Sequence, residues 1–530
     1  MWYGYCSGRA IFDQTIAMTF SNLKKLLNRC FLITLFVFIA IFQSCKKKPS
    51  KLANDLYRIT QNKIFINADP VAYTAIFKQE LVNMKLKLNN RVFIQKFYKN
   101  NDYEPVFAVD HLNNGDLDIL QYYYCKTYEH GLDPKLFEVD ELIPLIEKFH
   151  SKAGFKTIDE AYHTLAQLEL LTASSLLKYS NALQFGIINP KLIYRRYFTA
   201  TKRPDSISMM AVFTTKSIRS FLDSIQPKNP QYTALQKALA SGQPQQGLSK
   251  EETQRYLKVN LERLRWRNKP YEPKYVYVNI PDYELEVFED GKPVLNMKVC
   301  VGQGRNMDGK ETLMIFGDTS RYDKPFPRET PQLSSLIHSV NVNPVWNIPQ
   351  SIANKEIVVE AAQDRYYLAN KNIDVFKNGI KIEDPENIDW SLVTKENNDY
   401  EFKQRPGDDN SLGKIKFLFK NRSSVYLHDT PAKSPFSRAM RAVSHGCVRL
   451  GNPQALAQNL FGEGEDYDKI IKDMSEDNPE PTNIALPKKT PIYITYVTCW
   501  ADKNGLLQYR PDVYGLDIVL YASLEKLTSR

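Results

Sequence analysis

Apolar positions recur three and four residues apart from about residue 70 to residue 225, a spacing that predicts amphipathic helices. The pattern is clearest at residues 168–171, which read LELL, and it continues through Leu176, Leu177 and Leu183. Helices with apolar stripes of this kind bury those stripes by packing against one another. The first half of the chain is therefore expected to be helical.

A compositional shift marks the end of this half. Residues 226–254 are rich in Pro, Gln and Ser, which indicates a helix flanked by linker. We expect a helical domain over 70–259, with its linker at 226–254.

After about residue 270 the pattern shortens to the two-residue alternation of strands. β-branched and aromatic residues alternate with polar ones, and Gly, Asn, Asp and Pro separate the segments. Glu289-Asp290-Gly291 fits the tight turn of a hairpin. The fold class is thus α+β, with a mostly β second half. The expected strands are 275–280, 284–288, 294–301, 415–419, 424–428 and 491–498, and a helical segment near 350–368 interrupts them.

The N-terminal region has the pattern of an export signal. Residues 30–42 form an apolar run that is too short for a comfortable membrane span. Lys24, Lys25 and Arg29 precede this run, and Cys45 follows it. The segment resembles a bacterial lipoprotein signal over residues 1–44, with Cys45 as the lipidated residue and 45–69 as a tether. An uncleaved N-terminal anchor is the alternative, and both interpretations place the protein outside the cytoplasm.

Composition narrows the class of protein. Of the 530 residues, 43% are hydrophobic and 25% are charged, which excludes disordered and collagen-like chains. The net charge of +10 is small for this length, and no segment resembles a basic recognition helix, so no nucleic-acid partner is expected. None of the seven Cys belongs to a Cys-x-x-Cys pair, which argues against zinc fingers.

Two segments carry candidate chemistry. Residues 444–450 read SHGCVRL, and a predicted strand ends at His428 nineteen residues before Cys447. A cysteine attacks as its thiolate, and a nearby imidazole can hold it in that form. Backbone N–H groups around Gly446 and Cys447 could stabilise a tetrahedral oxyanion. The Asp429 side chain and a backbone carbonyl of the loop are alternative groups that could orient the imidazole.

The segment SHGCVRL resembles the signature of the YkuD-type L,D-transpeptidase catalytic domain. Further stretches that resemble the family are QRPG at 404–407, NSLGKIKF at 410–417, YLHDTP at 426–431, NPVWNIP at 343–349 and NLERLRW at 260–266. With LELLT at 168–172 and FYKNNDYEP at 97–105, these indicate the large, scaffold-bearing (YcbB-like) subfamily in a lipoprotein form. The resemblance implies a catalytic domain over 260–500 with a capping insertion at about 305–400, followed by a C-terminal extension at 501–530.

One departure from the subfamily is expected. Relatives commonly carry a small peptidoglycan-binding helical domain before the catalytic domain, but only about 25 residues separate Leu235 from Asn260. That length is too short for an independent domain. Recognition of carbohydrate is therefore expected elsewhere in the chain, or to be weak.

The resemblance implies an activity on peptidoglycan stem peptides. Cys447 would form a thioester with the third stem residue, His428 would transfer protons, and a second stem would give a 3→3 cross-link. Water as the acceptor would give an L,D-carboxypeptidase, and a non-catalytic peptidoglycan-binding envelope protein is the alternative from another class. No metal or cofactor is implied, carbapenem-type β-lactams are the expected inhibitors, and the location is periplasmic, lipid-anchored to an envelope membrane.

The remaining residues of the two segments receive supporting roles. Ser444, His445 and Gly446 are expected to shape the pocket, and Tyr426 to line it. Arg449 is expected to bind a substrate carboxylate or to brace the loop, because a guanidinium is a fork-like donor. A metal site formed by His428, His445 and Cys447 would have three ligands, but no further ligand cluster accompanies them.

Overall fold

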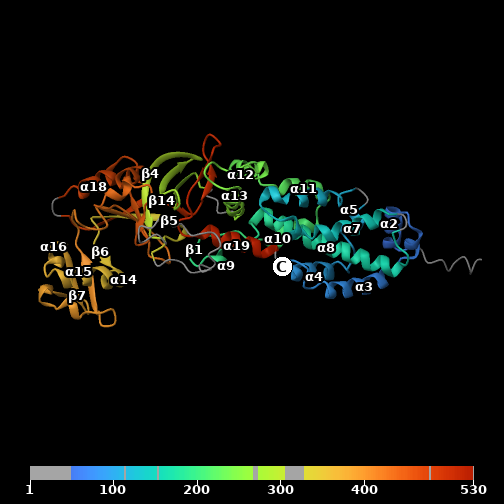
Figure 1. Ribbon diagram of the computed structural model, residues 1–530, viewed down its shortest axis with the longest axis horizontal. Helices are drawn as coiled ribbons and strands as arrows, with labels where there is room; N and C mark the ends of the chain where they lie inside the picture. Colours follow the sequence, from blue (N-terminus) through green and yellow to red (C-terminus); the bar gives the residue numbers. More distant parts are fainter. Residues whose placement is uncertain are drawn as a thin grey trace, which may run out of the picture.

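The computed structural model describes residues 49–112, 115–151, 154–266, 272–304, 328–476 and 479–528. The expected signal and Cys45 lie outside these ranges. Figure 1 shows an elongated molecule with helices at one end, a β-structure in the middle and a small lobe at the other end. Within the described ranges, no helix combines the length and the apolar character that a membrane span requires.

The helical domain is built around one long buried helix, α8, which is the expected helix at 168–183. Its 28 residues are buried on nearly every side, because the other helices surround it (Figure 1). The elements of this domain are α2 Lys51–Thr60, η1 Lys63–Asn67, α3 Pro70–Asn83, α4 Arg91–Asn100, α5 Phe107–His111, α6 Ile119–Cys125, η2 Lys126–His130, η3 Pro134–Phe137, α7 Val139–His150, α8 Ile158–Phe185, α10 Ser206–Phe213 and α11 Ile218–Ile225.

The expected tether at 45–69 is wrong for its described part. Residues 51–67 form α2 and η1, and Ala53, Leu56 and Phe65 are buried in the same apolar core as α8. These side chains recur at helical spacing, and burying them against the helical domain removes apolar surface from water. The folded domain therefore begins well before residue 70.

A buried carboxylate on α8 binds the N-terminal end of α5. Glu169 is fully buried in the middle of α8, and one of its oxygens accepts hydrogen bonds from Tyr98 Oη at 2.7 Å and from Val106 N and Phe107 N at 2.6 and 3.0 Å. The other oxygen accepts from Ala108 N at 2.8 Å. The first N–H groups of a helix have no partner within the helix and need other acceptors. In the core, where water is absent, Glu169 is that acceptor.

Replacing Glu169 with alanine is expected to destabilise the helical domain by more than about 3 kcal/mol, since several buried donors lose their acceptor at once. Urea unfolding followed by circular dichroism measures this loss. The matched control is Glu141→Ala, because Glu141 is half exposed and pairs with Lys87 at the surface. We expect that change to stay within about 0.5 kcal/mol; equal losses for the two variants would contradict the role given to Glu169.

Four elements connect the helical domain to the β-structure. The expected linker at 226–254 contains a full helix, α12, and the start of α13. Leu235, Leu257 and Leu261 of these two helices share a small buried cluster with Cys499 of the second half. The connecting elements are α9 Pro190–Ile193, β1 Tyr197–Phe198, α12 Pro230–Ser241 and α13 Lys250–Arg265.

The second half is a sheet that closes on itself. Its strand order is β1-β5-β10-β11-β13-β4-β3-β2-β14, β12 pairs with β4, and β14 also pairs with β5, which completes the ring. The strands are β2 Lys274–Asn279, β3 Glu284–Glu289, β4 Lys292–Gly302, β5 Gln332–Val342, β10 Ile415–Phe419, β11 Leu427–His428, β12 Ala442–Ser444, β13 Val448–Leu450 and β14 Thr482–Thr495, and helices α17 Pro453–Phe461 and α18 Glu465–Met474 precede β14.

The alternation seen in the sequence sets the two faces of this barrel. Val276, Leu285 and Val448 are examples of the apolar side chains that fill the interior. Their neighbours in sequence point outward, which places polar and aromatic side chains on the outer wall. The predicted hairpin turn is confirmed: Asp290 and Gly291 have φ of 47° and 77° between β3 and β4, as a type I′ turn requires.

The expected boundary of the capping insertion differs from the structure. Residues 332–342, which fall inside the expected range of 305–400, form β5 of the main barrel and pair with β14, β10 and β1. The separate lobe has its own core and its own sheet, in the order β6-β9-β7-β8. Its elements are β6 Trp346–Ile348, α14 Gln350–Ile352, η5 Ala353–Ile357, α15 Val358–Gln363, α16 Tyr367–Asn370, β7 Ile373–Lys377, β8 Ile380–Ile382, η6 Pro385–Asn387, η7 Trp390–Leu392 and β9 Tyr400–Gln404.

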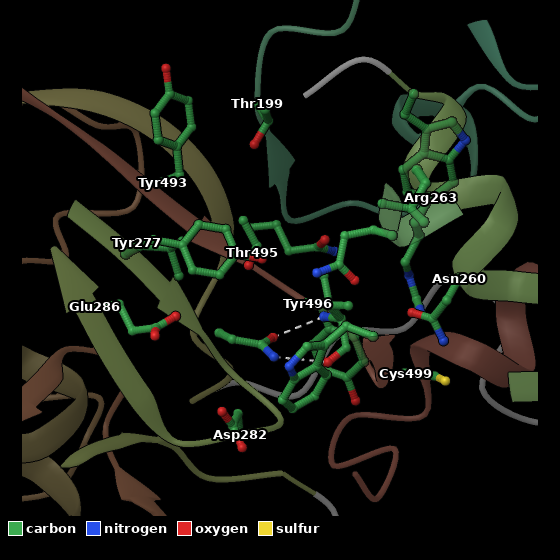
Figure 2. Close-up of a pocket in the computed structure, with 18 of the residues that line it drawn as sticks. Thr199, Asn260, Arg263, Tyr277, Asp282, Glu286, Tyr493, Thr495, Tyr496 and Cys499 are labelled. Atoms are coloured by element: carbon green, nitrogen blue, oxygen red, sulfur yellow. Dashed lines mark hydrogen bonds between the residues drawn. The ribbon is translucent and has the colours of Figure 1, made fainter. Parts of the chain in front are cut away.

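A cavity lies where α12, α13 and β1 face the outer wall of strands β2, β3 and β14. It has a volume of about 400 Å³, and Figure 2 shows aromatic and polar side chains lining it. This cavity is separate from the candidate catalytic residues, none of which line it.

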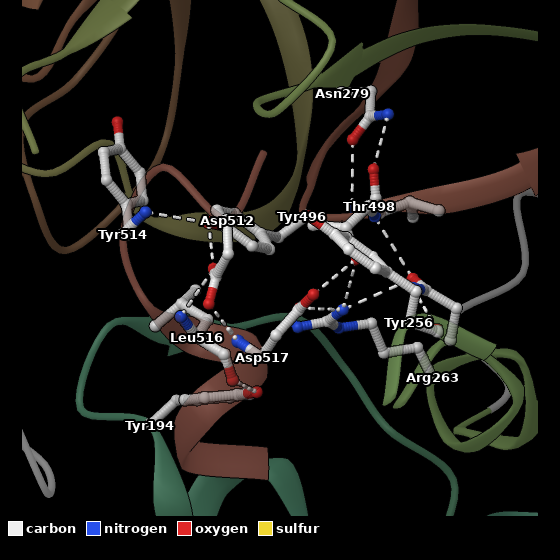
Figure 3. A network of polar contacts seen from close by, with 12 residues as sticks. Tyr194, Tyr256, Arg263, Asn279, Tyr496, Thr498, Asp512, Tyr514, Leu516 and Asp517 are labelled. Carbon is white, nitrogen blue, oxygen red and sulfur yellow. Dashed lines mark hydrogen bonds and ion pairs between the residues drawn. The ribbon is translucent and has the colours of Figure 1, made fainter. Parts of the chain in front are cut away.

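The C-terminal segment, expected as an extension, is folded into the same unit. Strands β15 Cys499–Ala501 and β16 Leu507–Tyr509 form a hairpin, and α19 Leu516–Thr528 buries Leu516 and Leu520 in the barrel's core. Figure 3 shows the polar network that anchors it: Arg263 of α13 pairs with Asp517 at 2.6 Å, and Thr498 donates to the same carboxylate. The segment therefore joins the helical connection to the barrel.

Candidate active site

Strand pairing brings the two candidate catalytic residues to one face of the barrel. Strand β11 runs parallel to β13, with Leu427 opposite Val448 and His428 opposite Arg449. Leu427 and Val448 are fully buried in the interior. Because side chains alternate, Cys447 shares the outer face with Arg449 and therefore with His428. The predicted meeting of the two segments thus arises from adjacent strands.

The position of the His428 ring is set by a backbone group. Its Nδ1 lies 2.5 Å from the carbonyl oxygen of Asp429, so Nδ1 carries the proton and donates it. Nε2 then keeps its lone pair and can accept a proton. The Asp429 side chain does not hold the ring: it accepts from Lys433 Nζ at 2.7 Å and from Lys414 N at 2.9 Å. Of the two orienting groups considered, the structure has the carbonyl.

Burial changes the protonation of both residues. It raises the pKa of the Cys447 thiol to about 11, even though contacts with Tyr426 and the charges of Arg449 and Lys416 act in the opposite direction. It lowers the pKa of His428 to about 4, and the charge of Arg449 adds to this effect. Burial thus favours a neutral thiol and a neutral imidazole, whereas the sequence predicts a thiolate held by the imidazole, and that ion pair stays a prediction.

The loop before Cys447 is fixed by its own side chain. Ser444 Oγ accepts from Gly446 N at 3.1 Å and donates to the Cys447 carbonyl at 2.5 Å. Gly446 has φ of 123°, a backbone conformation that other residues avoid. Since Gly446 N–H is used inside the loop, the Cys447 N–H is the member of that pair left to serve as an oxyanion donor.

A second set of hydrogen bonds, made by Thr330 and Tyr514, holds the loop before Cys447. Thr330 Oγ1 donates to the Gly446 carbonyl at 2.8 Å and accepts from Gly302 N at 2.8 Å. Tyr514 Oη donates to the Gly302 carbonyl at 2.7 Å and accepts from Thr330 N at 3.2 Å. A Cβ on Gly302 would lie 1.8 Å from the Arg328 carbonyl, so only glycine fits there. The sequence analysis did not find Thr330 or Tyr514, since neither belongs to a recognisable motif.

The inserted lobe touches the catalytic loop through one carboxylate. Glu356 of η5 lies 2.7 Å from His445 Nε2 and 2.7 Å from Arg328 Nη2. Burial acts to raise the pKa of Glu356, but His445 and Arg328 outweigh it and lower that pKa below its usual value. His445 therefore bonds to the lobe, and it takes a supporting position beside the candidate nucleophile.

Arg449, Tyr426 and Lys416 complete the outer face around Cys447. Tyr426 lies next to His428, with ring centroids 5.7 Å apart, and the ammonium of Lys416 lies 5.6 Å from the Tyr426 ring. Arg449 Nε is buried without a hydrogen-bond partner among the described residues. Lys416 was missed, although the alternation of residues 415–419 already places it on the outward face.

Two further features concern metal ligands and thiols. In the described ranges, no three His, Cys, Asp or Glu side chains form a group suited to a metal ion. The described cysteines, Cys125, Cys300, Cys447 and Cys499, are all free thiols. Cys300 lies opposite Arg449 on β4 and is fully buried, whereas Cys447 is partly exposed. Of the two thiols on this face, Cys447 is the one open to a substrate.

Comparison with known proteins gives the class. Residues 273–494 match the profile of the L,D-transpeptidase catalytic domain (YkuD), and residues 93–239 match that of the Scaffold domain. The chain therefore contains an L,D-transpeptidase catalytic domain preceded by a scaffold domain, the architecture of the large scaffold-bearing L,D-transpeptidases.

One protein is similar to most of the chain in sequence, and some solved structures are weakly similar to part of it. A Haemophilus influenzae protein named "Putative L,D-transpeptidase" is 27% identical over 450 residues, which are 83% of this chain and 82% of that protein. Solved structures similar to part of the chain include an L,D-transpeptidase from Mycobacterium smegmatis (13% identity, TM-score 0.20) and L,D-transpeptidase 3 from Mycobacterium tuberculosis (14% identity, TM-score 0.17). The matches cover 42% of this chain in both cases, and 58% and 61% of those chains.

Proposed function

We propose that this L,D-transpeptidase forms 3→3 cross-links between peptidoglycan stem peptides through a thioester on Cys447. The observation that carries the proposal is the shared outer face of His428, on β11, and Cys447, directly before the adjacent β13, with His428 Nδ1 bonded to the Asp429 carbonyl. This arrangement leaves a lone pair on Nε2, on the same face of the barrel as a partly exposed thiol, and a general base for a sulfur nucleophile needs such a lone pair.

The first half of the reaction starts from a neutral pair. The Cys447 thiol transfers its proton to His428 Nε2 while Sγ attacks the carbonyl carbon of the third stem residue. The Cys447 N–H stabilises the oxyanion that forms. When the intermediate collapses, the bond to the terminal D-Ala breaks, its amine takes the proton from His428, and a thioester remains on Cys447.

The second half resolves the thioester. An amine of another stem attacks the thioester carbonyl, loses a proton to His428 and displaces the sulfur, which recovers that proton as the thiol. Arg449 lies on the same face and is a candidate to bind a carboxylate of either stem, because a guanidinium is a fork-like donor that suits a carboxylate. Water in place of the amine gives the carboxypeptidase product.

The proposed location follows from residues 1–45, as an expectation of the sequence alone. A lipid on Cys45 would hold the folded domains at an envelope membrane, on the periplasmic side where peptidoglycan lies. Helix α2 begins only a few residues later, at Lys51. The helical domain would then be close to the membrane, with the catalytic barrel beyond it along the length of the molecule (Figure 1).

Incubating the purified protein with disaccharide-tetrapeptides tests the proposed reaction. We expect tandem mass spectrometry to find free D-Ala and dimers joined between two third residues. Disaccharide-tripeptides, which lack the leaving D-Ala, are the matched control and are expected to yield no dimer. Tripeptide products without dimers would replace the proposal with a carboxypeptidase. Neither product, from protein of native circular dichroism, would favour the non-catalytic binding protein.

A further inference from the structure

The cavity beside α13 has the features of a ligand site. Its volume of about 400 Å³ falls in the usual range for small-molecule pockets. One wall is the outer face of strands β2, β3 and β14, and the opposite wall comes from α12, α13 and β1. The chemistry at Cys447 uses a different wall of the barrel, since β3 and β4 separate β2 from β13 in the sheet.

The sheet wall of this cavity is a ladder of aromatic rings. Tyr275 and Phe288 are opposite each other on β2 and β3 and stack with centroids 5.0 Å apart and planes 9° apart. Tyr493 of β14 packs edge-on against Tyr275 at 5.9 Å and lies beside Tyr277. Figure 2 shows Tyr277 and Tyr493 along this wall. Such rings offer flat apolar faces while their hydroxyls remain polar.

A carboxylate without a cation lies among these rings. Glu286 is opposite Tyr277, and within the described part of the chain it has no ion pair or hydrogen bond. Its acidic neighbours differ, because Asp282 pairs with Arg510 at 2.6 Å and Glu284 with Arg441 at 3.0 Å. Burial raises the pKa of Glu286, and the charges of Asp282 and Glu284 add to the effect. A ligand that brings hydroxyl or amine donors would satisfy this group.

Two buried neutral groups reach the cavity from the other side. Thr199 and Gln332 are 7% and 6% exposed, both line the cavity, and the described residues provide no hydrogen bond to either side chain. In Figure 2 the Thr199 side chain points toward the cavity. Hydroxyls and amides both donate and accept. The Thr199 hydroxyl and the Gln332 amide therefore suit a ligand whose own groups both donate and accept hydrogen bonds. A bare cation suits them less well.

We propose that this cavity binds one or two sugar units of the peptidoglycan glycan strand. The flat C–H face of a pyranose ring would pack on the aromatic ladder, while its hydroxyls donate to Glu286 and exchange hydrogen bonds with Thr199 and Gln332. The proposal rests on the proposed function, because it supplies the glycan part of a substrate whose peptide part reacts at Cys447. It also gives the carbohydrate recognition expected to lie outside a dedicated binding module.

Isothermal titration calorimetry of the purified protein with tetra-N-acetylchitotetraose tests the site. This probe is a peptide-free chain of β-1,4-linked N-acetylglucosamine. We expect wild-type protein to bind it and Glu286→Gln to bind at least about tenfold more weakly, since the change replaces a charged acceptor. The matched control is Glu289→Gln on the same strand, where Glu289 pairs with Lys274 outside the cavity. That variant is expected to bind like wild type.

A second pair of variants guards against misfolding at Glu286. Tyr493→Leu removes one ring of the ladder and is expected to weaken binding, whereas Tyr366→Leu, at an exposed position of the lobe, is expected not to. Thermal unfolding of each variant separates lost binding from lost fold. Equal affinities across all four variants, or no binding by wild type, would overturn the proposal.

The outcome for the cavity is independent of the outcome for catalysis. Acylation of Cys447 by a carbapenem, followed by intact mass, is expected to be the same in wild type and Glu286→Gln. If Cys447 is acylated but wild-type protein does not bind the sugar, the cavity proposal is wrong and the proposed enzyme activity stands. If the protein binds the sugar but does not turn over stem peptides, the cavity proposal stands and the proposed activity is wrong. If 1,5-diaminopentane binds in place of the sugar, and Glu286→Gln abolishes that binding, the cavity is a cation site and the sugar proposal is wrong.

Discussion

Replacing Cys447 with alanine is expected to abolish both the acyl-enzyme and the 3→3 cross-link, because Cys300, the other thiol on this face among the described residues, is fully buried. Without the sulfur, the covalent intermediate does not form. Intact mass spectrometry after carbapenem treatment measures the adduct, and digestion of the tetrapeptide reaction measures the dimers. The fold is expected to persist, since only one sulfur is removed from a partly exposed position.

Two other thiols provide matched controls for this result. Cys125 is exposed in the helical domain, and Cys300 is buried opposite Arg449 on β4. Cys125→Ala and Cys300→Ala are each expected to keep the adduct at one carbapenem per chain. An adduct that survives in Cys447→Ala, or that disappears in Cys125→Ala, would move the nucleophile elsewhere. Cys300 is fully buried, so a carbapenem does not reach its thiol in the folded protein.

Replacing His428 with alanine is expected to slow acylation by about a hundredfold to ten-thousandfold, the range that a positioned general base contributes. Stopped-flow fluorescence with a carbapenem measures the rate. The matched control is His150→Ala, because His150 is a half-exposed histidine of the helical domain that pairs with Asp118. A rate for His428→Ala within twofold of wild type would remove His428 from the mechanism.

The pH dependence of this rate has a predicted direction. Burial lowers the pKa of His428 to about 4, below its ordinary value of 6.5, so the neutral base form persists in mildly acidic solution. The acid limb of the acylation rate is therefore expected near pH 4. The same depressed pKa means that the unfolded chain binds the proton more readily, so folding stability falls as the pH drops from 6.5 through 4. A limb near pH 6.5 would contradict the burial of the ring.

Local patterns in the sequence were enough to predict much of the fold. Strands β2, β3 and β10 alternate apolar and polar residues, and this alternation reflects directly which face enters the core. Strand β5 was missed because it was read as part of the inserted lobe. Its identity as a barrel strand depends on pairing with β14 and β10, segments that lie far along the chain. Such long-range pairing leaves no local signal.

The candidate site likewise contains some residues that the sequence reveals and others that it does not. Cys447 and His428 are recognisable because each belongs to a short motif, and the register of β11 and β13 then places them together. Thr330, Glu356 and Tyr514 come from separate segments and contact the loop only after the chain has folded. Their roles follow from tertiary contacts, which a single sequence does not contain.

The contacts of Tyr514 have a consequence for how the chain matures. Strand β14 ends at Thr495, so a chain synthesised to that point has every strand of the barrel. It still lacks the hydroxyl that holds Gly302 and Thr330, and through Thr330 the Gly446 carbonyl. The nucleophile loop is thus completed by a residue that is made after every strand of the barrel. The barrel strands can therefore be complete before the loop that carries the thiol gains its last hydrogen bonds, which need the segment after β14.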